Sequence, residues 1–97
     1  MISELKDKQG SVNIDLKIIY DQIAAKETFG KLIKTVIVVD VDNATSTPSA
    51  LLDLYNDDCA KFKFQDKIRV TNAYAKLAKT DKNQFRITYA EKVELIR

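Results

Sequence analysis

Residues 50–62 read ALLDLYNDDCAKF, an apolar stretch that leads directly into a capping residue and two acids. The first six of these residues have the length and composition of a short strand. Asn56 can cap a helical turn, and Asp57 and Asp58 suit the positive end of its dipole. We therefore expect a strand over 50–55 that continues into a short helix or 3-10 turn.

Two more strands are predicted before this stretch. Apolar and polar residues alternate over 11–21, with only Ile19 out of phase, which is the pattern of a half-buried strand. Over 31–41, seven of the eleven residues are Leu, Ile or Val, as in a central strand. The segment 24–30 loses the alternation and predicts a loop, and the turn-forming residues of 42–49 predict a long turn.

Two strands are predicted after it. The alternation resumes over 67–77 and again over 85–89, and the polar segment 78–83 between them is typical of a turn. The apolar residues after the fifth strand are expected to close one end of the domain: Val93, Leu95 and Ile96.

Five strands with one short helical insert between the third and the fourth indicate an all-β domain that must close or sandwich to hide its edges. The predicted fold is a five-stranded Greek-key OB-fold barrel. An SH3-like barrel and a small sandwich remain alternatives, and the position of the helical insert favours the OB-fold. At 97 residues the chain is long enough for one core, so we expect a single domain over 1–97.

The residue inventory argues against catalysis. The sequence has no histidine, one cysteine (Cys59) and two glycines, which removes the usual triads, most metal sites and the phosphate-cradling loops. We expect no enzyme activity, no cofactor and no metal. The unpaired cysteine, the charged first eight residues and the lack of a long apolar run predict an intracellular protein with no membrane partner, in a prokaryotic cytoplasm or in a nucleus.

Charge is unevenly distributed along the chain. Between residues 61 and 86 there are eight basic and two acidic residues, a net of +6, whereas 40–58 has five acids and no base. A folded chain with this asymmetry can present one positive face to a polyanion. The alternative is that these charges are solvated strand edges that suppress aggregation.

Several short motifs occur in a shared order over nearly the whole chain. They are ISELKDK at 2–8 followed by SVNI at 11–14, VIVVD at 36–40, LDLYND at 52–57 and FQDKIRVTNAY at 64–74. In this order the sequence resembles the single-domain single-stranded DNA-binding proteins of archaea and their eukaryotic relatives, kin to replication protein A. The resemblance implies an OB-fold that binds single strands by base stacking and phosphate contacts.

Two tyrosines are the candidate stacking residues. If Leu52 and Leu54 point inward, Tyr55 and Asp53 point outward. Tyr74 follows the inward alternation unless a bulge at 72–73 turns it outward, as the resemblance implies. The alternative for both tyrosines is packing at the rim of the core with the hydroxyl in water.

Phosphate binding requires basic side chains beside the stacked bases. The candidates are Lys31, Lys34, Lys76, Lys79 and Arg86, each of which could instead be a solvated charge. The other aromatic residues are expected to pack, although Phe29 in the first loop could be exposed: Tyr20, Phe29, Phe62, Phe64, Phe85 and Tyr89.

The leading functional prediction is a monomer or weak dimer that binds single-stranded DNA, with RNA as a further candidate. The site would be the exposed face of the second and third strands and the flanking loops. The alternative is a protein-interaction subunit of a replication, repair or telomere-type complex with little nucleic-acid binding. The net charge of only +2, the absence of tryptophan and the outward Asp53 favour that alternative. An anticodon-type RNA-binding module is disfavoured because such modules usually accompany an enzyme domain.

Overall fold

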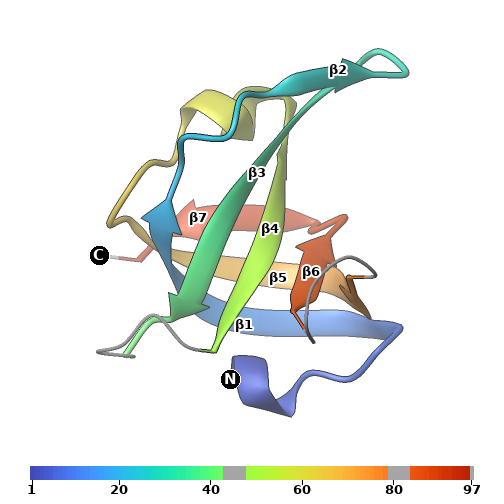
Figure 1. Ribbon diagram of the computed structural model, residues 1–97, viewed down its shortest axis with the longest axis vertical. Coiled ribbons are helices and arrows are strands. Elements are labelled where there is room, and N and C mark those ends of the chain that lie inside the picture. Colours follow the sequence, from blue (N-terminus) through green and yellow to red (C-terminus); the bar gives the residue numbers. More distant parts are fainter. Residues whose placement is uncertain (43–47, 79–83, 97) are drawn as a thin grey trace.

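The computed structural model describes residues 1–42, 48–78 and 84–96. No helix among these residues is long and apolar enough to cross a membrane. The elements are two 3-10 turns and seven strands (Figure 1): η1 (Ile2–Glu4), β1 (Gln9–Tyr20), β2 (Lys26–Thr28), β3 (Lys31–Asp40), β4 (Ser49–Tyr55), η2 (Asn56–Ala60), β5 (Lys67–Leu77), β6 (Phe85–Thr88) and β7 (Lys92–Leu95).

Five of the strands close into a barrel. β1 pairs antiparallel with β3 on one side and with β5 on the other. β3 pairs antiparallel with β4, β4 runs parallel to β6, and β6 pairs antiparallel with β5. The closed circuit β1–β3–β4–β6–β5, with η2 between its third and fourth strands in chain order, confirms the predicted all-β, OB-fold-like class.

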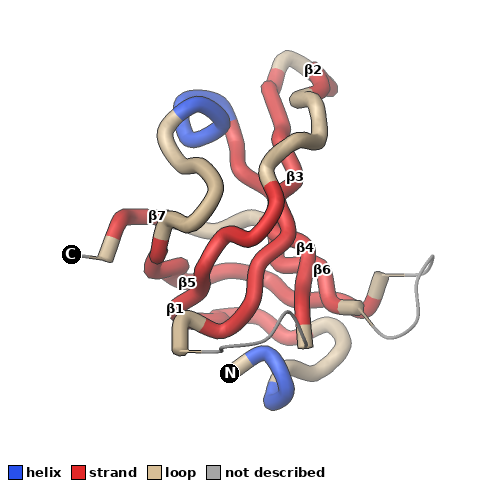
Figure 2. Tube along the Cα trace, turned by 60° about the vertical axis from the view of Figure 1, so that its left-hand side comes forward, coloured by secondary structure: helices blue, strands red, loops and turns tan. Residues whose placement is uncertain are grey.

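The loop predicted over 24–30 contains a strand, so that prediction is wrong. β2 pairs with residues 31–33 of β3 through a two-residue turn formed by Phe29 and Gly30. Both residues have positive φ angles, 51° and 78°, as a type I′ hairpin turn requires. The hairpin extends away from the barrel (Figures 1 and 2) and leaves Phe29 99% exposed.

The predicted fifth strand over 85–89 is β6, which ends at Thr88, and a further strand, β7, follows it. β6 and β7 both pair with β5, and the chain turns between them at Tyr89, whose φ is 54°. β7 was not predicted and adds a strand at the open end of the sheet. Val93 is buried as expected, but Leu95 is 41% exposed, so only part of this segment closes the core.

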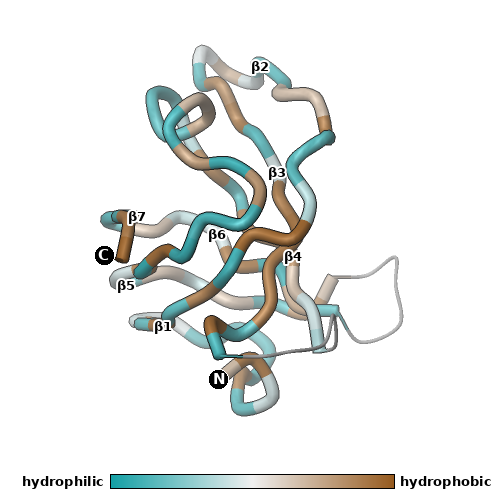
Figure 3. Tube along the Cα trace, turned by 90° about the vertical axis from the view of Figure 1, so that its left-hand side faces the viewer, coloured by the Kyte–Doolittle hydropathy of each residue, from teal (hydrophilic) through white to brown (hydrophobic). Residues whose placement is uncertain are grey.

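Alternating residues of the strands fill the barrel. Figure 3 shows a hydrophobic run where β3 crosses the barrel, and Val36 and Val38 of β3, which point inward, are fully buried. Burial of each leucine, isoleucine or valine stabilises the fold by about 1.5–3 kcal/mol, so this alternation determines which face of each strand turns inward. The fully buried core side chains include Leu16, Ile18, Val36, Val38, Leu52, Leu54, Ile68, Val70 and Ile87.

The short N-terminal turn covers one end of the barrel. Ile2 of η1 is buried in the core, and its backbone N–H donates a hydrogen bond of 2.8 Å to the carboxylate of Asp40 at the end of β3. Asp40 is itself buried. This acid, one of the five that make 40–58 negative, therefore holds the N-terminal segment.

Candidate nucleic-acid interface

The outer surface of β3 and β4 is determined by their register. Thr35 lies opposite Asp53, and Ile33 lies opposite Tyr55, whereas the buried Val36 lies opposite the buried Leu52. Because neighbouring residues of a strand point to opposite faces, Asp53 and Tyr55 lie on the outside, as predicted. We call the outer surface of β3, β4, β6 and β5 that carries Tyr55, Tyr74 and Tyr89 the tyrosine face.

A bulge in β5 places Tyr74 on this face. Between the pairs Val12–Ala73 and Ile14–Val70, β5 has one residue more than β1, and Asn72 in this bulge has a φ of 51°. The extra residue reverses the alternation, so that Ala73 is buried and Tyr74 is outside the core and half-buried. The conditional expectation of a bulge that turns Tyr74 outward is therefore confirmed.

The ring of Tyr55 is backed by a second tyrosine. The rings of Tyr55 and Tyr89 are stacked with centroids 6.0 Å apart and an interplanar angle of 16°. The hydroxyl of Tyr55 shares a hydrogen bond of 2.5 Å with Thr88, which in turn lies opposite Tyr74 in the β5–β6 ladder. Burial raises the pKa of the Tyr55 phenol above its ordinary value. Thr88 thus links all three tyrosines into one surface.

Tyr89 was expected to pack in the core and does not. Its side chain is 67% exposed, and its positive φ turns it out of the β6 strand. A tyrosine is rarely found in this backbone region, so the stacked contact with Tyr55 accompanies a local conformational cost. The alternation of 85–89 suggested an inward Tyr89, and no local sequence signal marks the break in the strand.

Arg86 is already bound within the protein. Its Nη1 lies 2.5 Å from Oδ1 of Asp53, and Thr35 donates a hydrogen bond of 2.8 Å to the same oxygen. Asp53 is only 6% exposed, although it faces outward. The guanidinium of Arg86, which was predicted to contact phosphate, is therefore paired with a carboxylate, and it neutralises the negative charge of Asp53.

The predicted lysines are divided between two faces. Lys31 is exposed and shares its strand face with Ile33 and Thr35, and exposed Lys76 shares the face of Tyr74. Lys34 instead lies opposite Leu54 in the register, so its side chain starts from the other face of β3. Lys79 lies outside the described residues. The structure thus brings two of the five predicted basic residues, Lys31 and Lys76, to the tyrosine face as exposed cations.

Tyr20 and Phe64 are also exposed, contrary to the packing prediction, and Phe29 is exposed, as the prediction for the first loop allowed. Phe29 is at the hairpin tip, Phe64 lies in the turn before β5, and Tyr20 ends β1. Only Phe62 is buried, and Phe85 is half-buried against the core. Gly30 was the one sequence signal for the exposure of Phe29, because a tight hairpin turn favours glycine and exposes its tip.

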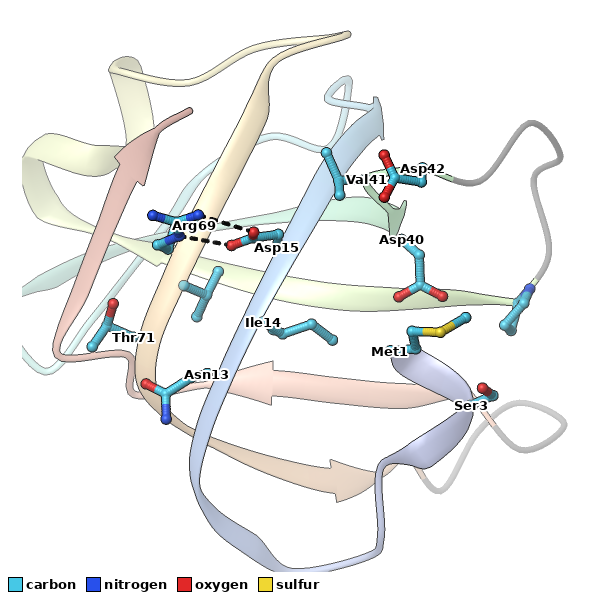
Figure 4. A pocket seen from close by; sticks show the side chains of 12 residues that line it. Met1, Ser3, Asn13, Ile14, Asp15, Asp40, Val41, Asp42, Arg69 and Thr71 are labelled. Carbon is cyan, nitrogen blue, oxygen red and sulfur yellow. Dashed lines mark hydrogen bonds and ion pairs between the residues drawn. The ribbon is translucent and has the colours of Figure 1, made fainter. Parts of the chain in front are cut away.

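A separate pocket lies beside β1 (Figure 4). Its volume is about 720 Å³, and its lining includes the carboxylates of Asp15, Asp40 and Asp42. Arg69 bonds both oxygens of Asp15, at 2.9 and 3.1 Å, which lowers the pKa of that carboxyl. Its acidic lining makes this pocket a poor phosphate site. Within 1–42, 48–78 and 84–96, no three metal-ligating side chains gather in one place.

No family model matches the chain, and no curated protein matches it. The resemblance to single-stranded DNA-binding proteins therefore rests on the motifs quoted above.

Proposed function

We propose that the protein binds single-stranded nucleic acid, with DNA as the first candidate, on the tyrosine face. The observation that carries this proposal is the stacked pair of Tyr55 and Tyr89 beside Tyr74 on the outside of an OB-fold-like barrel. Sequence-tolerant binding of single strands uses aromatic rings of this kind, and each stacked base contributes about 1–3 kcal/mol. An intracellular role in replication or repair belongs to the same proposal.

The exposed ring of Tyr89 is the principal stacking surface in this proposal. Tyr55 has one face against Tyr89 and its hydroxyl bonded to Thr88, so it acts as the support of the outer ring. Tyr74 offers a second ring across Thr88. A strand of nucleic acid that crosses the face would stack one base on Tyr89 and a neighbouring base on Tyr74.

The charges on the face support only a modest electrostatic contribution. The central pair Asp53–Arg86 is close to neutral, and the predicted phosphate ligands that the face exposes are Lys31 and Lys76. Two phosphate contacts give a slope of log affinity against log salt of about −1.4, at about 0.7 per contact for single strands. Stacking therefore has the larger share of the binding free energy.

Fluorescence anisotropy with labelled oligo-dT and oligo-U, each at a low and a high salt concentration, tests the proposal. We expect saturable binding of oligo-dT with a shallow salt slope and quenching of tyrosine fluorescence. The matched control is a duplex of the same length, which hides its base faces and should bind more weakly. Equal binding of single strand and duplex, or no binding at low salt, would refute the proposal.

A protein-interaction role is the second candidate, and the ion pair of Asp53 and Arg86 is the observation that favours it. A nucleic-acid surface gains from free cations, whereas this face binds its central arginine internally. Failure of oligo-dT and oligo-U to bind at low salt, with the fold intact, would select this second function.

A further inference from the structure

β7 presents unpaired backbone groups at the open end of the sheet. The N–H of Ile96 donates a hydrogen bond of 2.9 Å to the carbonyl of Lys67 on β5. Hydrogen-bonded and non-hydrogen-bonded pairs alternate in an antiparallel ladder, so Glu94 is bonded to β5 and Val93 and Leu95 are not. The N–H and C=O groups of Val93 and Leu95 therefore point away from β5, and β5 is the one strand that β7 pairs with in the described part of the chain.

A groove of about 500 Å³ lies along this edge. It is lined by Asp58, Lys61 and Phe62 on the side of η2 and by residues 91–95 on the other. Figures 1 and 2 show η2 and the segment after it on the same side of the molecule as β7. Buried Phe62 and partly exposed Leu95 supply apolar surface inside the groove. Its volume lies within the range of about 300–1,000 Å³ that is typical of ligand sites.

The shape of the groove favours one extended segment over a second copy of the protein. A second copy that paired through its own β7 would bring the rest of its sheet against the wall formed by η2. A single peptide strand has no such sheet behind it. It can pair with the free groups of Val93 and Leu95 and place alternate side chains over Phe62 and Leu95.

The charges of the groove indicate the sign of the charge that its ligand carries. The lining contains three acids and two lysines, a net of −1. Lys61 pairs with Asp58 at 3.8 Å and Lys92 pairs with Glu94 at 3.7 Å. Glu91 has no lysine partner among the described residues, and one of its carboxylate oxygens accepts a hydrogen bond of 2.9 Å from the side-chain amide of Asn72. A basic side chain on the ligand would complement Glu91.

We propose that β7 accepts an extended peptide segment of a partner protein as an added strand. The segment has apolar residues at alternate positions and a basic residue beside Glu91. This site shares no lining residue with the tyrosine face, so it does not depend on the proposed nucleic-acid binding.

Amide hydrogen exchange, followed by NMR, tests the pairing directly. In the free protein the amides of Val93 and Leu95 should exchange fast, while those of Glu94 and Ile96 are protected by β5. The probe is the peptide acetyl-KVTVKV-amide, and the control is the same peptide with proline at both outer valines, which cannot complete a ladder. We expect saturable binding of the probe with a Kd below about 1 mM and protection of the Val93 and Leu95 amides. Protection that rises with protein concentration in the absence of peptide would identify a second copy as the occupant and overturn the proposal, as would unchanged exchange at saturating peptide.

Two variants make the test specific. Leu95→Pro removes an N–H that points to the free edge and leaves the β5 hydrogen bonds in place, so it should abolish peptide binding. Glu91→Lys should weaken binding of the basic probe about two- to fivefold, the scale of an exposed ion pair, and should favour acetyl-EVTVEV-amide by a similar factor. This second variant keeps the test valid if Leu95→Pro does not fold. Unchanged peptide binding in both variants would refute the proposal, and oligo-dT binding should be the same in Leu95→Pro as in the wild type.

Discussion

Asp53 of β4 and Arg86 of β6 form an ion pair across two parallel strands, with Nη1 2.5 Å from Oδ1 and the hydroxyl of Thr35 bonded to the same carboxylate oxygen. Asp53 is buried, whereas the Arg86 side chain is 32% exposed. The pair therefore cancels the charge at the centre of the tyrosine face, and of its two side chains Arg86 is the one that lies partly in solvent. This cancellation determines how strongly the face can attract phosphate.

Asp53→Asn should strengthen binding of single-stranded DNA. The substitution keeps an oxygen for Thr35 and Arg86 but removes the negative charge, so that the guanidinium becomes a net cation. We expect the salt slope to steepen by up to about 0.7. Loss of the charge-assisted hydrogen bond should lower the free energy of unfolding by about 1–3 kcal/mol, measured by urea denaturation. The opposite variant, Arg86→Gln, should weaken binding, and equal salt slopes in the two variants would contradict the prediction.

Tyr89→Ala should weaken binding of oligo-dT by about 1 kcal/mol at every salt concentration. The value lies at the low end of the range for base stacking because removal of Tyr89 uncovers the ring of Tyr55. The salt slope should not change, since no phosphate contact is lost. The matched control is Phe64→Ala, which removes another exposed aromatic ring in the turn before β5 and should bind normally. Titration by anisotropy at two salt concentrations measures both quantities, and equal losses in the two variants would exclude Tyr89 as a specific stacking residue.

Lys76→Ala and Lys34→Ala should differ in their salt dependence. Lys76 lies on the tyrosine face, so its removal should reduce the magnitude of the slope by about 0.7. Lys34 pairs with Leu54 in the β3–β4 register, so its side chain starts from the face of β3 that does not carry the tyrosines. Its removal should therefore leave the salt slope unchanged. The two variants remove the same charge, and each is thus the control for the other. A reduced slope in Lys34→Ala would show that its side chain reaches the bound strand.

Tyr55→Phe should reduce the loss of folding stability that occurs at alkaline pH. The folded protein has a raised pKa at Tyr55, caused first by burial, so the neutral phenol is favoured by folding. This contribution is fully present below the ordinary pKa of about 10 and is lost as the pH rises through the raised folded value. Thermal melting across this alkaline range should show a fall that is smaller in Tyr55→Phe. Titration of phenolate absorbance provides the direct check. Tyr55→Phe should have one fewer tyrosine that ionises above the ordinary phenol pKa.

The sequence by itself determined the local elements that build the barrel. The alternation of 11–21 and 67–77 predicted long half-buried strands because periodicity depends only on neighbouring residues. The polar residues after the apolar residues of β4 predicted a helical turn there, and η2 begins at Asn56. The expected cap at Asn56 is wrong, because the N-cap position falls on Tyr55 and no side chain caps the turn. The alternation of residues 52–55 likewise predicted that Tyr55 points outward. Tyr74 could be placed outside only on the condition of a bulge, which the register of β1 and β5 now supplies.

Only the tertiary structure decided which of the candidate residues share a face. The register of β3 against β4 puts Lys34 away from Tyr55, and the parallel contact of β4 with β6 joins Asp53 to Arg86, which are far apart in the sequence. The turn at Tyr89 brings its ring onto Tyr55 and lets the chain return to β5 as β7. A shift of one residue in any of these pairings would move a whole set of side chains to the other face, and the pairings are determined by burial over the entire core, not by residues adjacent in the chain.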